Sequence, residues 1–158
     1  MFSILAEALC KYTNHDDIVI SSPYAHRDSR HLNHIVGYLV SMVPIRYEKA
    51  INLNVFQKRI NEDFLEANAD FNELLPRLEL SADAGYHPLQ QVVFAWQDGV
   101  ISTPVLPGIK VSVGETKLEH SKFPLMLSMH QSNSEFNLKW EFTPSLVSTE
   151  TVICLEKI

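Results

Sequence analysis

The segment His26–Asn33, HRDSRHLN, contains the residue types of a phosphoryl-transfer site. It fits the pattern H-R-D-x-x-x-x-N of the protein-kinase catalytic loop, in which the Asp is the base and the Asn binds magnesium. A kinase also needs a Gly-rich phosphate loop, a strand lysine and a D-F-G metal ligand, and the sequence contains none of them. Only 25 residues precede His26, which leaves no room for the nucleotide-binding strands. The sequence therefore argues against a kinase.

A second chemistry to consider is metal binding by His26, His31 and His34. His31 and His34 are three residues apart, a spacing that can bind zinc from one helix when a third ligand is available. The sequence contains no H-E-x-x-H and no C-x-x-C, and no G-x-S-x-G elbow marks a nucleophilic serine. We interpret the histidines as the solvated side of a helix and predict no metal site.

The overall composition limits the class of protein. The 158 residues are enough for one domain, and 46% of them are hydrophobic, which argues against disorder. The formal charge of −6 disfavours nucleic-acid binding, because a polyanion would be repelled. The sequence contains no signal peptide and no apolar run of about 18 residues, so we expect no membrane partner and a cytoplasmic location. Cys10 and Cys154 are interpreted as small buried hydrophobic residues.

Hydrophobic periodicity predicts helices and strands that alternate along the chain. Helices are expected over residues 2–14, 28–40, 54–64, 72–80 and 148–158. Strands are expected over residues 16–22, 42–48, 91–96, 109–113, 125–129 and 136–142, the last two as a hairpin. Asn54 and Ser148 are the expected helix caps. Pro23 should stop the first strand, and Pro44 should place the second at an edge or bulge. This order predicts one α/β (α+β) domain with a mixed β-sheet and packed helices.

The segment 28–40 has the strongest helical pattern. Asp28 or Ser29 can cap it, and its apolar residues follow the spacing i, i+3, i+4, i+7, i+8. The expected buried face consists of Leu32, Ile35, Val36, Leu39 and Val40. This helix would direct the residues that follow it toward a site.

Five stretches, in order along the whole chain, resemble motifs of the C-terminal lobe of condensation domains from non-ribosomal peptide synthetases. DDIVISSPYAHR (16–27) is similar to D-D-I-V-x-G-x-P-x-A-x-R, and LNHIVGYLVSMVPIR (32–46) to I-G-x-F-V-N-T-L-P-L-R. DAGYHPLQQVVFAWQ (83–97) resembles R-D-x-S-x-N-P-L-F-Q-V-M-F. SKFPLMLSM (121–129) resembles K-F-D-L-x-L, and EFTPSLVSTETV (141–152) resembles E-Y-N-x-x-L-F-x-x-x-T-I. Five ordered matches are far more specific than one eight-residue pattern.

The chain also departs from the family pattern. Ser41-Met42 replaces the family's Asn-Thr pair, and Ala82 and Gly85 replace the Arg and Ser of R-D-x-S. Across residues 66–72, where H-Q-D-x-P-F-E would fall, only Phe71 matches. The motif H-H-x-x-x-D-G, whose second His is catalytic in the family, occurs nowhere in the chain. These departures indicate an atypical member or one with altered specificity.

The resemblance implies a fold in which two chloramphenicol-acetyltransferase-like lobes form a V with the active-site tunnel between them. Residues 1–158 would be the C-terminal lobe, and the irregular segment 97–121 would be an arm that crosses to the N-terminal lobe. The intact enzyme would join an acceptor amine to a donor thioester. Both substrates would be carried on the phosphopantetheine arms of carrier proteins, so those arms are substrates and no cofactor is bound directly.

The same resemblance implies the site residues. No catalytic residue is expected within the chain. The tunnel wall is expected to include Gly37, Ser41 and Met42, at the C-terminal end of a helix that faces the other lobe. The two candidate arginines would hold strand and loop carbonyls or a carboxylate. The supporting residues are expected to be Arg27, Arg46, Asp83 and His87.

Without the catalytic His, we expect the chain to be inactive alone, and three accounts of it stay open. It is a fragment of a larger synthetase, one polypeptide of a split condensation domain, or a degenerate carrier-protein docking module without catalysis. The last residues, EKI, break off inside an expected helix, which favours the fragment. The expected partners are the N-terminal lobe and carrier proteins. A lobe that faces another should expose apolar surface, so self-association is expected as well.

Overall fold

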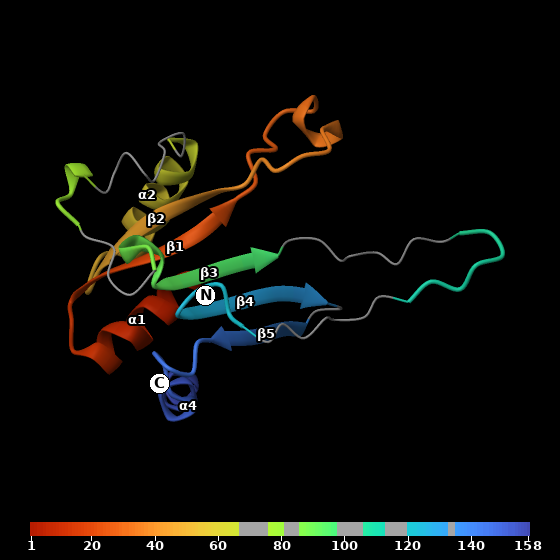
Figure 1. The fold of residues 1–158 in the computed structure, drawn as a ribbon. Helices are drawn as coiled ribbons and strands as arrows, with labels where there is room; N and C mark the ends of the chain where they lie inside the picture. The colour runs from red at the N-terminus through yellow and green to blue at the C-terminus, as the bar shows by residue number, and fades with distance from the viewer. Residues whose placement is uncertain (67–75, 81–85, 98–105, 113–119, 133–134) are drawn as a thin grey trace.

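The computed structural model describes residues 1–66, 76–80, 86–97, 106–112, 120–132 and 135–158. The elements, in chain order, are α1 (Phe2–Thr13), β1 (Asp17–Tyr24), the 3₁₀ turn η1 (Leu32–His34), β2 (Ser41–Glu48), α2 (Leu53–Leu65), the 3₁₀ turn η2 (Pro88–Gln90), β3 (Val92–Gln97), β4 (Leu125–Ser132), β5 (Glu135–Phe142) and α4 (Thr149–Lys157). Five strands form one sheet in the order β2-β1-β3-β4-β5 (Figure 1). β1, β3 and β4 are parallel, whereas β2 and β5 pair antiparallel at the two edges. The mixed α/β fold expected from the sequence is confirmed.

One apolar cluster joins the helices to the sheet. Because side chains alternate between the two faces of a strand, each strand contributes every second residue to this cluster. Ile20 of β1 and Ile45 of β2 are both 0% exposed. Leu5 of α1, Phe56 of α2 and Val152 of α4 belong to the same cluster. The helices and the sheet therefore form two layers around a shared core.

Most of the expected strands are confirmed, with shifts at their ends. Pro23 does not stop β1, because it lies within the strand opposite Met42 of β2. Pro44 lies in the edge strand β2, as expected, where a missing backbone N–H is tolerated. Ile109 forms only an isolated bridge with Leu106, and residues 110–112 are not in a strand. Residues 72–75 of the expected helix 72–80, and Val113, lie outside the described residues. In the described remainder, residues 76 and 77 are helical and residues 78–80 are not.

The expected helix over 28–40 is wrong. The segment contains only the single turn η1, and Val36 and Tyr38 are 102% and 87% exposed. It connects two strands whose last pair is Tyr24 and Ser41, and Figure 1 shows it beyond the end of the sheet. A short amphipathic helix gains most of its stability by packing its apolar face against a core. None of the expected face residues is buried in this position, so Asp28 and Ser29 cap no α-helix.

The two cysteines differ in their environment. Cys10 is buried in α1 as expected, and burial raises the pKa of its thiol. The expectation for Cys154 is wrong, because this residue is exposed. Val152 and Leu155 form the buried face of α4, and Cys154 lies off that face because residues two apart on a helix do not share a side. Ser148 caps α4 through its hydroxyl, which accepts from the Thr151 N–H.

The cap of α2 is Asn52 rather than the expected Asn54. Its side-chain oxygen accepts from the N–H groups of Asn54 and Val55 at 2.9 and 3.4 Å. We expect Asn52→Ala to lower the free energy of unfolding by about 1 kcal/mol, because two amides of the first turn lose their acceptor. Asn54→Ala is the matched control and should change it by less than about 0.5 kcal/mol. Urea denaturation measures the free energy of unfolding of both variants, and equal losses would contradict the assignment of Asn52 as the cap of α2.

Candidate functional site

The parallel strands β1, β3 and β4 bring their carboxyl ends to one end of the sheet, which we call the carboxyl end. In open α/β sheets, ligands bind in crevices outside the carboxyl ends of the strands. Residues 25–40 leave β1 at this end, and Figure 1 shows residues 25–40 and 106–112 beyond it. The carboxyl end is therefore where a ligand site is expected.

A cavity of about 730 Å³ lies at this end, and we call it the carboxyl-end pocket. Its walls come from the last residues of β1 and the loop after them, the last two turns of α2, and β3. Its volume is within the range of small-molecule sites. The lining residues are Ser22, Pro23, Tyr24, Ala25, Arg27, Asp28, Asn61, Phe64, Leu65 and Trp96.

Aromatic rings form much of this wall. The ring of Tyr24 lies 5.1 Å from that of Phe64 and 4.7 Å from that of His26. Trp96 is 42% exposed, and its ring lies 6.0 Å from that of Phe136. These separations are within the range of favourable aromatic pairs. The pocket thus combines half-exposed rings with the charged side chains of Arg27 and Asp28.

Two short polar contacts fix the loop after β1. The Tyr24 hydroxyl donates to Asp28 Oδ1 at 2.6 Å, and this hydrogen bond raises the pKa of Tyr24, with burial as a second cause. His26 Nε2 lies 2.5 Å from Ser41 Oγ. His26 also has a φ of 49°, which is uncommon for a residue other than glycine. The hydrogen bond to Ser41 and the ring contact with Tyr24 offset the cost of that conformation.

The two arginines have structural partners at different places. Arg27 donates to the carbonyl oxygens of Leu32 and Ile35 at 2.6 and 3.1 Å, so it holds segment 25–40 in shape. Arg46 makes two-pronged hydrogen bonds to the Asp17 carboxylate, the shortest at 2.6 Å. This contact lowers the pKa of Asp17. Because Asp17 is the first residue of β1, Arg46 lies at the opposite end of the sheet from the pocket.

The remaining expected site residues are only partly brought together. Ser41 and Met42 begin β2 beside the end of β1, so they lie at the carboxyl end. The α-helix expected directly before them, over residues 28–40, is not formed. Gly37 is exposed within segment 25–40. His87 lies before β3, at the other end of that strand, where its Nδ1 accepts from the Leu89 N–H. Asp83 lies outside the described residues.

Sequence reasoning did not identify the aromatic wall. The sequence predicts a helix over residues 54–64 but no site role for Tyr24, Phe64 or Trp96. Their signal was indirect, because Tyr24 lies within the matched stretch 16–27 and Trp96 within 83–97. Only the sheet order, with β1 beside β3, brings these two residues to one pocket.

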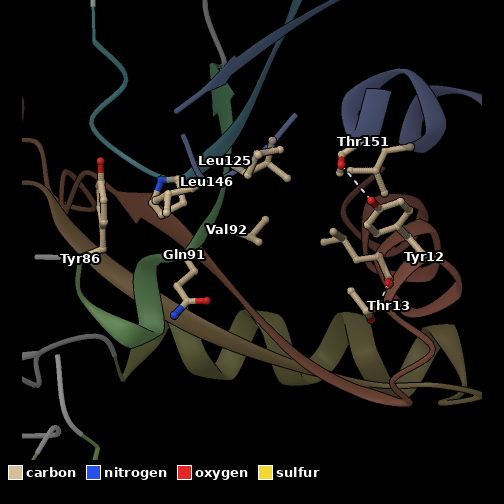
Figure 2. Close-up of a pocket in the computed structure, with 12 residues that line it drawn as sticks. Tyr12, Thr13, Tyr86, Gln91, Val92, Leu125, Leu146 and Thr151 are labelled. Atoms are coloured by element: carbon tan, nitrogen blue, oxygen red, sulfur yellow. Dashed lines mark hydrogen bonds between the residues drawn. The ribbon is translucent and has the colours of Figure 1, made fainter. Parts of the chain in front are cut away.

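A second cavity, of about 490 Å³, lies at the opposite end of β3 and β4, against α1 and α4. Figure 2 shows Tyr12 and Thr151 at one side of it, joined by a hydrogen bond of 2.8 Å, with Val92 and Leu125 between them and Tyr86. None of its lining residues among the described part of the chain carries a charge at neutral pH. This pocket offers packing surface rather than acid–base chemistry.

Two kinds of feature are absent from the described residues. They contain no group of three or more His, Cys, Asp or Glu side chains placed to hold a metal ion. Within the same residues, no helix combines the length and apolar character needed to cross a membrane.

The chain is similar to known proteins along nearly its whole length. The family model described as "Condensation domain" matches residues 1–157. Surfactin synthase subunit 1 from Bacillus subtilis is 26% identical over 157 residues, which cover 96% of this chain and 4% of that protein. Malpibaldin synthetase from Mortierella alpina is 28% identical over 162 residues, which cover 96% of this chain and 3% of that protein. The chain therefore spans only a small part of these relatives.

Solved structures show the same fold. The X-domain from teicoplanin biosynthesis superimposes with a TM-score of 0.79 at 18% identity, covering 99% of this chain and 39% of that one. The condensation domain from the Monacolin K polyketide synthase MokA has a TM-score of 0.77 at 16% identity, covering 99% of this chain and 38% of that one. In both cases nearly the whole chain corresponds to less than half of the solved chain.

Proposed function

The chain belongs to the condensation-domain family, and from this premise we propose that it is the C-terminal lobe of a domain that forms amide bonds in non-ribosomal peptide synthesis. The observation that carries the proposal is the convergence of two matched stretches on one pocket. Residues 16–27 supply Tyr24 and Arg27 to the carboxyl-end pocket, and residues 83–97 supply Trp96. The residues that resemble the family therefore gather where the sheet favours a ligand.

The proposed reaction joins two substrates carried by phosphopantetheine arms. The acceptor amine attacks the donor thioester carbonyl, the carbon–sulfur bond breaks, the thiol leaves, and the amine loses a proton. Such a reaction needs its two reactants held in line, a group that accepts the proton, and donors for the oxyanion. This lobe supplies one wall of the tunnel, with Ser41 and Met42 at its edge, and part of the carrier-docking surface.

The proton acceptor is proposed to lie on an N-terminal lobe, because the string H-H-x-x-x-D-G does not occur in the 158 residues. The surface that would face that lobe is apolar at the carboxyl end. Its exposed residues include Val36, Tyr38, Trp96, Phe136 and Leu138. The same surface would support self-association of the isolated chain, and segment 97–121 is proposed as the arm that crosses to the N-terminal lobe.

The test is reconstitution. The chain is mixed with a separately purified N-terminal lobe that carries H-H-x-x-x-D-G, together with donor and acceptor carrier proteins loaded with aminoacyl groups. We expect dipeptidyl thioester, detected by mass spectrometry of the acceptor carrier, only when both lobes are present. Replacing the second His of the partner lobe by Ala should abolish the product.

The reconstitution also addresses the second candidate, a docking module without catalysis. This alternative is favoured by Ser41-Met42, which replaces the family's Asn-Thr pair. Carrier binding by the chain, with no product from any lobe mixture, would contradict the enzymatic proposal and support the docking module.

A further inference from the structure

The carboxyl-end pocket has features that select one class of substrate. Its wall contains the rings of Tyr24, Phe64 and Trp96, and the apolar side chains of Pro23 and Leu65. Tyr24 and Phe64 already contact one another, whereas Trp96 keeps 42% of its surface exposed. A ring that enters the pocket would find aromatic partners on more than one side.

The polar groups at the pocket include one carboxylate, Asp28, that an amine can contact. Arg27 donates to the carbonyl oxygens of Leu32 and Ile35, which hold its guanidinium toward segment 25–40 without cancelling its positive charge. Asp28 is exposed and receives one hydrogen bond, from Tyr24, on Oδ1. A carboxylate has about four acceptor positions, so Asp28 can accept from an ammonium group as well. A cation near the faces of Trp96 and Tyr24 would also be attracted by their π-electrons.

We propose that the carboxyl-end pocket binds the aromatic side chain of an amine-bearing substrate, with Asp28 facing the ammonium group. This inference rests on the proposed function, because it assigns the pocket to the acceptor of the condensation reaction. An aliphatic side chain of equal size would fill the same volume but would lack the ring–ring interactions, whereas the attraction of its ammonium group to Trp96 and Tyr24 would remain. The selectivity therefore depends on the aromatic character of the side chain rather than on its size.

Three probes separate these contributions in the isolated chain. Phenylalanine amide has the ring and the amine, cyclohexylalanine amide has the amine with a saturated ring of similar size, and 3-phenylpropionamide has the ring without the amine. The chain contains two tryptophans, Trp96 and Trp140. Tryptophan fluorescence, excited where phenylalanine does not absorb, reports binding, and Trp96→Phe should remove the signal change.

We expect phenylalanine amide to bind about 3-fold to 10-fold more tightly than cyclohexylalanine amide, which matches the free energy of one added aromatic pair. Asp28→Asn should weaken phenylalanine amide about 3-fold while leaving 3-phenylpropionamide unchanged. Ala25→Leu, at an exposed position of the lining, should fill the pocket and weaken all three probes. Leu65→Trp, on the exposed end of α2, is a second filling variant should Ala25→Leu fail to fold.

Equal affinities for phenylalanine amide and cyclohexylalanine amide, or no binding by any probe, would overturn the substrate assignment. Affinities that do not change in the filling variants would place the binding elsewhere and overturn it as well. These outcomes are distinguishable from failure of the proposed function. If reconstituted lobes condense an aliphatic acceptor as well as an aromatic one, the proposed condensation activity is supported and the assignment of an aromatic substrate is refuted.

Discussion

Ile20→Ala is expected to lower the free energy of unfolding by about 3 to 4 kcal/mol, as is usual when a buried Ile is truncated in a packed core. Ile20 is 0% exposed and lies in β1, which is flanked by β2 and β3. Its partner across the ladder, Ile45, is also 0% exposed. Neighbours on both sides are held by the sheet, so they cannot collapse into the space that the side chain leaves. Urea denaturation followed by circular dichroism measures the loss.

Val19→Ala is the matched control for this variant. Val19 precedes Ile20 in the same strand, points to the other face, and is 38% exposed. Its truncation should lower the free energy of unfolding by about 1 kcal/mol or less, because part of the side chain is already in water. Equal losses for the two variants would show that the helix-covered face of the sheet is not the main core.

Tyr47 should make the protein less stable as the solution becomes strongly alkaline. Its side chain is 1% exposed and donates to Glu7 Oε1 at 2.7 Å, and burial, followed by this hydrogen bond, raises the pKa of Tyr47 to about 12. In the unfolded chain the pKa of a tyrosine is about 10. Between these values the unfolded chain releases the proton and the folded chain keeps it, so stability falls as pH rises. The contribution is complete below about pH 10 and is lost by about pH 12, with a total near 2 to 3 kcal/mol.

The variant Tyr47→Phe isolates this contribution. Chemical denaturation at several pH values should show a steep decline between about pH 10 and 12 in the original protein and a shallower one in the variant. The remaining decline comes from groups present in both proteins, including Cys10 and Tyr24, whose pKa values are also raised. Parallel declines in the two proteins would contradict a buried, protonated Tyr47.

The sequence by itself determined β1 to β5 and the helices α1, α2 and α4, because their signals are local. Apolar residues at alternate positions predicted β4 and β5 as a hairpin, and a hydroxyl at Ser148 predicted the start of α4. The five ordered motifs also predicted the family, and the match over residues 1–157 confirms it. Each of these inferences depends on residues that are close together along the chain or on their order.

Only the tertiary structure decided whether the apolar residues of segment 25–40 would find a partner. Their spacing is that of a helix, yet Val36 is fully exposed because the segment extends beyond the sheet. The tertiary structure also decided which residues form the pocket. Tyr24, Phe64 and Trp96 are up to 72 positions apart and meet because β1 lies beside β3 and α2 packs against the same core. A pocket depends on such long-range contacts, and local patterns carry no information about them.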